Sequence, residues 1–177
     1  MKRILIVLTC LVMAAPVLAQ SVGEKTGVNS AQGISPSTPD FVKQVAISDM
    51  FEIESNKIGE NKGNAAQKSF AAEMVRDHTK TSAELKSLVS SGKVTAELPA
   101  AVDSSHQSKL DKLKAKTGDD FVAEFNSIQV SAHKDAVSLF ERYANGGDNA
   151  ELKAWAGKTL PHLRHHLEMA QKLDDKK

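Results

Sequence analysis

The sequence contains little that supports thiol chemistry, strong charge or a membrane span. Cysteine occurs once in 177 residues, which excludes an intrachain disulfide framework and a cysteine-based zinc site. The formal net charge of +1 gives no support for binding to nucleic acid or for a polybasic membrane patch. Apart from a short apolar run near the N-terminus, no segment approaches the ~18 apolar residues of a transmembrane helix, so we expect no membrane span. Motifs of common enzymes (GxSxG, the P-loop, GxGxxG before a strand, HExxH) are also absent from the sequence.

The first nineteen residues have the pattern of a secretory signal peptide. Lys2 and Arg3 precede an apolar run over residues 4–13, and small side chains at Val17 and Ala19 suit cleavage after residue 19. Cleavage removes Cys10, so the mature chain has no thiol for catalysis. It also lowers the basic count from 23 to 21 against 22 acidic residues, a net charge of −1. We therefore expect an exported protein, located in the periplasm of a Gram-negative bacterium or secreted.

Residues 20–39 differ in composition from the rest of the chain. They are rich in glycine, serine and proline and show no apolar periodicity, which is typical of a flexible linker. We expect one folded domain over residues 40–174.

Glycine and proline divide this domain into helical segments. Apolar periodicity predicts long helices over residues 40–61, 64–91, 119–145 and 149–173, and a short polar helix over residues 103–116. We expect Thr38 to cap the first of these helices and Asp148, with Glu151 three residues later, to cap the last. No segment alternates like a strand, so the prediction is an all-α protein. Its architecture is an antiparallel, ferritin-like four-helix bundle with the short helix as a crossover.

Each long helix places one ionisable side chain at or beside its inward-facing seam. Steps of three and four residues bring His78 and His166 onto the apolar seams of their helices, and His133 beside the third seam. Glu52 shares an arc of the first helix with two serines. Burial of four such groups is unfavourable unless they pair or bind something, and neutral imidazole and carboxylate are ligands of first-row metals. Glu52, His78, His133 and His166 are therefore candidate ligands for one divalent transition metal: zinc, copper, nickel or iron.

Other polar residues lie near these candidates. Asp77 and Glu73 neighbour His78 on its helix, Gln129 lies one turn before His133, and His162 lies one turn before His166. We take them as supporting groups or alternative ligands. His162 and His166 together also have the spacing of a chelating pair on a helix surface. For each group a simpler interpretation stays open: a buried hydrogen-bond network, or a solvated helix face.

Several segments resemble a known family along nearly the whole domain. They are FAAEMVRDHTKTSAELKSL, QVSAHKDAVSLFERYANGGDNAELKAWAGKTLPHLRHHLEMAQ and the segment around Glu52. They are similar to an exported bacterial family of unknown function, often labelled "predicted outer membrane protein", with a ferritin-like helical bundle. The resemblance implies that Glu52, Asp77, His78, His133 and His166 occupy its recurring ionisable positions. The long helices lack the Glu-x-x-His motif of di-iron proteins, so we do not expect ferroxidase activity.

Three functions are compatible with these observations. We favour a non-catalytic periplasmic protein that binds one metal ion in the bundle core and acts in stress or envelope function. The alternatives are a metal-dependent redox or hydrolytic enzyme at the same site, and a structural or interaction bundle without metal. A second copy of the chain or another envelope protein is the kind of partner that stays open.

Overall fold

The computed structural model of the chain describes residues 27–174. Over these residues it contains six α-helices and no strand, so the all-α prediction is confirmed. The predicted signal peptide, residues 1–19, lies outside the described residues. The helices are α2 (Val28–Ala31), α3 (Thr38–Lys62), α4 (Ala65–Ser90), α5 (Ser104–Ala115), α6 (Gly118–Gly146) and α7 (Ala150–Asp174).

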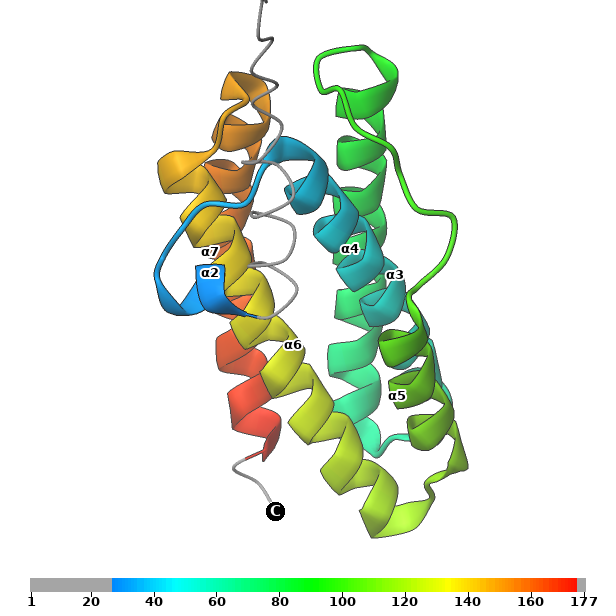
Figure 1. Cartoon of the computed structure of the whole chain (residues 1–177). Helices are drawn as coiled ribbons and strands as arrows, with labels where there is room; N and C mark the ends of the chain where they lie inside the picture. The colour runs from blue at the N-terminus through cyan, green and yellow to red at the C-terminus, as the bar shows by residue number, and fades with distance from the viewer. Residues whose placement is uncertain (1–26, 175–177) are drawn as a thin grey trace, which may run out of the picture.

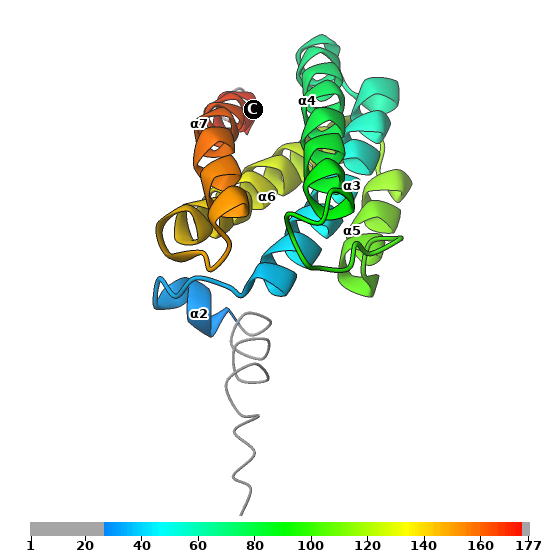
Figure 2. The same ribbon diagram turned by 90° about the horizontal axis from the view of Figure 1, so that it is seen from above.

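The four long helices form two pairs of sequence neighbours. Helices α3 and α4 pack along each other, as do α6 and α7, while contacts between the two pairs are fewer (Figure 1). In the view from above, α7 lies apart from α4, whereas α6 runs obliquely from α7 toward α3 (Figure 2). The short helix α5 packs on α3, next to the seam with α6. Side-chain contacts between the two helix pairs are therefore important for the stability of the domain.

The helix starts explain why the chain turns where it does. Asn64 caps α4 in a reciprocal capping box with Gln67, and Asp103 caps α5 by accepting from the backbone N–H of His106. Two predicted caps are wrong by one residue. Ser37 rather than Thr38 caps α3, and the side chain of Asn149 accepts from the start of α7.

Thr38 and Asp148 are instead used in a tertiary contact. The hydroxyls of Thr38 and Tyr143 are hydrogen-bonded to each other, and the Thr38 hydroxyl donates to Asp148 at 2.5 Å. The Tyr143 hydroxyl also lies 3.2 Å from Asp148 Oδ1, so its single proton is shared between Thr38 and Asp148. This contact ties the start of α3 to the turn between α6 and α7, which is why neither side chain is left to cap its own helix.

Residues 20–39, which we expect to form a flexible linker, include described residues that contact the helical domain. Residues 28–31 form a helical turn, and the backbone carbonyl of Ile34 accepts from Arg142 of α6 at 2.7 Å. Ser30 and Ser138 are hydrogen-bonded at 3.2 Å, and Asn29 is buried. Composition alone predicted flexibility because polar contacts with a distant helix leave no periodic pattern in the sequence.

The interior consists of two apolar clusters separated by a polar layer. The first cluster includes Phe41, Tyr143 and Leu152, and the second includes Met74 and Phe125. On every long helix, buried polar residues lie between the positions that belong to the two clusters. These buried polar residues are Asp49, Glu52, Ser55, Asn56, His78, Gln129, His133 and His166. All four helices therefore contribute to one polar layer at the same level of the domain.

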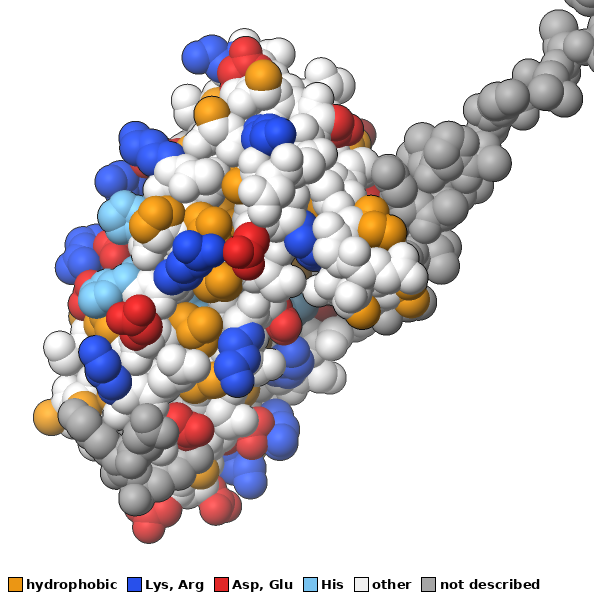
Figure 3. All heavy atoms as spheres, turned by 90° about the vertical axis from the view of Figure 1, so that its left-hand side faces the viewer, with side chains coloured by type: hydrophobic (Ala, Val, Ile, Leu, Met, Phe, Trp, Pro, Cys, Tyr) orange, Lys and Arg blue, Asp and Glu red, His pale blue; other side chains and the backbone are white. Residues whose placement is uncertain are grey.

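The surface of the domain carries mixed charge. The face formed by α6 and α7 shows both signs of charge interspersed with small apolar areas, and histidine side chains reach the surface there (Figure 3). Within residues 27–174, no helix is both long and apolar enough to cross a membrane.

Candidate metal centre

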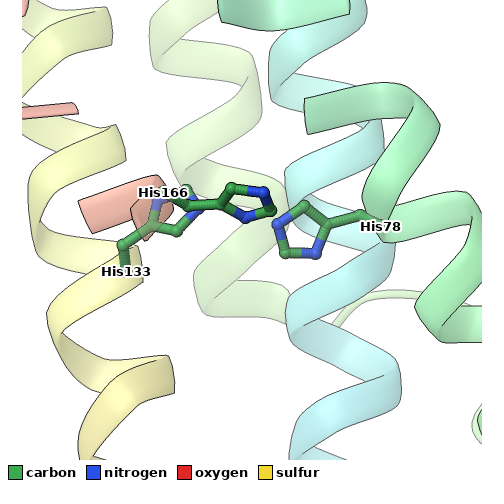
Figure 4. A group of neighbouring side chains, drawn as sticks. All are labelled: His78, His133 and His166. Atoms are coloured by element: carbon green, nitrogen blue, oxygen red, sulfur yellow. The ribbon is translucent and has the colours of Figure 1, made fainter. Parts of the chain in front are cut away.

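Three histidines from three helices converge at the centre of the polar layer. His78 of α4, His133 of α6 and His166 of α7 each offer a ring nitrogen, and these nitrogens all lie within 4.8 Å of one another. The three ring centroids form a nearly regular triangle with sides of 5.6 Å. The rings approach one another from opposite sides of the bundle (Figure 4). All three side chains are buried.

One nitrogen of each ring is held by an acceptor outside the triangle. His78 donates through Nδ1 to Asp49 Oδ1 at 2.8 Å, and His133 donates through Nδ1 to its own helix, at the backbone carbonyl of Gln129, also at 2.8 Å. His166 donates through Nε2 to Asp77 Oδ2 at 3.1 Å. Such bonds fix the tautomer of a ligating histidine, because the remaining nitrogen keeps its lone pair.

The remaining nitrogens are buried and unsatisfied. His78 Nε2, His133 Nε2 and His166 Nδ1 have no hydrogen-bond partner among the described residues, and neither does Glu52 Oε1. A buried polar atom without a partner destabilises a protein by roughly 1–3 kcal/mol. Asn56 Oδ1, in the same layer, also has no partner among the described residues. Unpaired buried atoms are uncommon in folded proteins, and the three histidine nitrogens, which lie close together, call for a common explanation.

Glu52 lies in the same layer but is held differently. Its Oε2 accepts from the Asn56 side chain at 2.8 Å, and Asn56 also donates to the Gln129 side chain at 3.2 Å. Gln129 in turn donates to Ser55 at 3.1 Å. These buried amides orient one carboxylate oxygen and leave the other free. The compact group of mutually close ligand atoms contains the three histidines and not Glu52.

The electrostatics of the layer favour neutral imidazole at two positions. Burial and the neighbouring charges of His78 and His133 lower the pKa of His166 to about 4. Burial also lowers the pKa of His133. His78 differs: burial alone would lower its pKa, but the hydrogen bond and the charge of Asp49 outweigh that effect and raise it. Neutral imidazoles are the form that binds metal.

The structure brings some of the predicted supporting residues to the cluster and not others. Asp77 and Gln129 contact His166 and His133 respectively, Gln129 through its backbone carbonyl. Glu73 instead lies half-exposed beside Arg76, 3.8 Å from it.

His162 also stays outside the cluster. His162 is exposed while His166 is buried, so the two side chains have different surroundings on α7. The reason is helical phase, since only His166 continues the buried seam formed by Leu163 and Ala170.

Sequence reasoning missed Asp49. It lies three residues before Glu52 on α3, so helical spacing places both carboxylates on the same side of that helix. This three-residue spacing is the sequence signal from which Asp49 could have been identified. Asp49 is nearly fully buried and also accepts from Ser82 at 3.1 Å. It therefore serves as the buried anchor of His78.

This arrangement has the chemistry of a site for one first-row transition metal. Three imidazole nitrogens with free lone pairs face a common point, and their other nitrogens bond to carboxylates or a carbonyl. Zinc, copper, nickel and iron all accept imidazole ligands, whereas calcium and magnesium prefer oxygen. The three buried histidines could hold such an ion.

The comparisons with known proteins place the chain in a family without a defined activity. The family model described as "Domain of unknown function (DUF4142)" matches residues 23–173. No curated protein and no solved structure shows a significant match to the chain. The match begins before α2, in agreement with the packing of that segment on α6. The chain therefore belongs to the DUF4142 family of domains of unknown function.

Proposed function

We propose that this protein is a non-catalytic periplasmic metal-binding protein that holds one divalent transition metal ion in the core of a ferritin-like bundle. His78, His133 and His166 are three of the ligands, and Glu52 is the fourth. The observation that carries the proposal is the set of four buried unpartnered atoms, one from each long helix: Glu52 Oε1, His78 Nε2, His133 Nε2 and His166 Nδ1. A single cation between the three histidine nitrogens would satisfy those three atoms, and Glu52, which lies outside the compact group of ligand atoms, would complete the set by moving toward the ion.

A metal-free hydrogen-bond network explains the layer less well. Each histidine already uses one nitrogen for a bond to an outer acceptor. The free nitrogens of the neutral His133 and His166 rings are both acceptors, so they cannot bond to each other. A protonated His78 would satisfy only one of them. A metal ion removes this conflict because it accepts electron pairs from all of them.

The closed geometry supports storage, transfer or structural use of the metal rather than catalysis. Catalytic zinc sites keep an open coordination position, whereas sites with four protein ligands are structural. Glu52 and the three histidines are each at most 4% exposed. Export to the periplasm is supported by the signal-like residues 1–19. An envelope function in metal handling or stress fits this location.

Metal content is the direct test. Protein purified without a histidine tag is stripped with a chelator, reloaded with zinc, copper, nickel or iron, and assayed by elemental analysis. We expect about one equivalent of tightly held metal. The key variant carries alanine at His78, His133 and His166. Its matched control carries alanine at the other three histidines, His106, His162 and His165, which are exposed or half-exposed.

The proposal requires that the core variant lose the bound equivalent and the control retain it. Uptake that is unchanged in the core variant would overturn the proposal. Thermal unfolding gives a second readout, because a ligand present at a hundredfold excess over its Kd stabilises the folded state by about 2.7 kcal/mol. For a domain of this size that corresponds to a rise in Tm of about 5–10 °C, which we expect for the control and not for the core variant.

A further inference from the structure

We infer that Asp77 is a positioning residue that latches His166, and that metal ions enter and leave the site at the edge between α4 and α7. This inference rests on the proposed metal binding at the three histidines. It assigns to one ligand, His166, the movement that metal exchange requires.

The three histidines differ in how firmly they are enclosed. The Asp49–His78 pair is buried on both sides, with side chains 5% and 3% exposed. His133 is bonded to the carbonyl of Gln129 within its own helix, and its side chain is buried. The Asp77–His166 pair is different, because the His166 side chain is 5% exposed while that of Asp77 is 32% exposed. Solvent therefore comes closest to the cluster along this pair.

The same pair crosses the weaker seam of the domain. His166 belongs to α7 and Asp77 to α4, so their hydrogen bond joins the two helix pairs. Helix α4 contacts α7 much less than it contacts its own partner α3, and α7 lies apart from α4 in the view from above (Figure 2). A side chain at a sparsely packed seam rotates with less disturbance of its neighbours than one within a tightly packed pair.

A large groove on another side of the domain does not offer a better route. It has a volume of about 950 Å³ and runs between α3, α5 and α6. Among the described residues that line it are Ile47, Phe51, Ile128 and Ala132, but none of the three histidines and not Glu52. Because none of the four candidate ligands lines it, the groove gives a cation no direct contact with the cluster.

The geometry gives the steps of exchange. His166 would hold the ion through Nδ1 while Nε2–H donates to Asp77. Rotation of the ring toward solvent would break the bond to Asp77 and withdraw Nδ1 from the ion, which would take a water molecule in its place. The strength of the Asp77 bond therefore sets how often the site opens. At high metal concentration, opening limits the rate of uptake, so the observed rate reaches a plateau.

The experiment measures the rate of Co²⁺ uptake by the metal-free full-length mature protein in a stopped-flow spectrometer, over increasing Co²⁺ concentration. Tetrahedral Co²⁺ absorbs in the visible range and reports occupancy of the site. We expect a plateau rate in the unmodified protein and a plateau about tenfold to a hundredfold higher in Asp77→Ala, the change that corresponds to the loss of one charge-assisted hydrogen bond. Asp77→Asn keeps an acceptor, so its plateau lies between the two.

Two controls separate this role from a structural one. Glu73→Ala removes a half-exposed carboxylate one turn earlier on α4, and its plateau should equal that of the unmodified protein. Ser131→Phe fills the groove and should also leave the plateau unchanged. A residue that only supports the fold or the ligand's basicity would raise the dissociation rate without raising the plateau of uptake.

The outcomes are distinct. An Asp77→Ala plateau equal to that of the unmodified protein, or slower uptake in Ser131→Phe, overturns the inference while metal binding stands. Failure of the unmodified protein to bind Co²⁺, zinc or copper at equilibrium overturns the proposed function itself. Because the Asp77 side chain is partly exposed, we expect its variants to fold, which circular dichroism checks.

Discussion

Asp49 and His78 form a hydrogen bond of 2.8 Å between two side chains that are both almost completely buried. Burial raises the pKa of Asp49, and this effect outweighs the hydrogen bond and the charge of His78, which lower it. A second bond from Ser82 at 3.1 Å fixes the other carboxylate oxygen. The two hydrogen bonds thus fix the orientation of the pair, and the His78 ring faces the other two histidines (Figure 4).

The Asp49→Asn variant tests this anchor. An amide keeps an acceptor for His78 but loses the negative charge that makes the ring a better electron donor. We expect metal affinity to fall about tenfold to a hundredfold, as for other partners of ligating histidines. Competition with a chromophoric chelator measures the change. Asp103→Asn is a matched control, because Asp103 and His106 form a pair with the same 2.8 Å distance at the surface. Equal losses in both variants would contradict the assigned role.

The lowered pKa of His166 predicts that the stability of the metal-free protein depends on pH. Its pKa is lowered from 6.5 to about 4, chiefly by burial and then by the charges of His78 and His133. Between these two pH values the unfolded chain binds more protons than the folded one. The contribution of His166 is therefore fully present above pH 6.5 and is lost as the pH falls through about 4.

The His166→Asn variant isolates this effect. Urea unfolding in the presence of a chelator, at several pH values between about 4 and about 7.5, gives the difference in stability between the unmodified protein and the variant. We expect this difference to shift against the unmodified protein by on the order of 3 kcal/mol as the pH falls across that range. His78, whose raised pKa acts in the opposite direction, is present in both proteins, but its charge is coupled to His166, so the measured shift belongs to the coupled pair. His165→Asn, at an exposed position, should show no such shift.

Glu52→Gln should change affinity and stability in opposite directions. The introduced amide has nearly the same shape as the carboxylate and still accepts from Asn56, but it brings no charge into the buried layer. We expect weaker metal binding and metal-free stability that is unchanged or higher, because an unpaired carboxylate oxygen is no longer buried. Metal titration and urea unfolding measure the two quantities. Glu54→Gln on the exposed side of α3 should alter neither.

The sequence predicted the helices well because the last three long segments have a clear apolar period, the first is apolar over most of its circumference, and glycine or a polar residue marks the ends. The helix expected over residues 64–91 is found over 65–90, and that expected over 119–145 is found over 118–146. The three histidines were predicted for the same reason, since His78 and His166 continue apolar seams. Their common height was not predictable, because it depends on how four antiparallel helices align.

What the sequence did not reveal are contacts between distant segments. Asp49 pairs with a residue 29 positions later, and Thr38 bonds to Tyr143, 105 positions away. Neither leaves a periodic signal within its own helix. Thr38 and Asp148 have the residue types of helix caps, and local reasoning therefore assigned them to caps that Ser37 and Asn149 provide. Tertiary hydrogen bonding overrode a correct local preference.

Two helical glycines give a test of how tightly the helix pairs are packed. A Cβ atom added at Gly59 of α3 would lie 2.6 Å from the Phe125 ring and 3.2 Å from Ala71, so three helices approach one another there. At Gly157 of α7 the nearest atom would be Ala144 Cβ at 3.9 Å, an ordinary contact. Gly59→Ala should therefore destabilise the protein by about 1–3 kcal/mol through overpacking.

Gly157→Ala serves as its matched control. With space for the methyl group, the better helix propensity of alanine should stabilise the fold by up to about 1 kcal/mol. Urea unfolding of both variants measures the two effects, and opposite signs are expected. A destabilised Gly157→Ala together with a neutral Gly59→Ala would show that α3 does not approach Phe125 as closely as the structure has it. Because Gly59 lies two turns beyond Glu52 on α3, the same overpacking should displace the carboxylate and weaken metal binding, whereas Gly157→Ala should leave affinity unchanged.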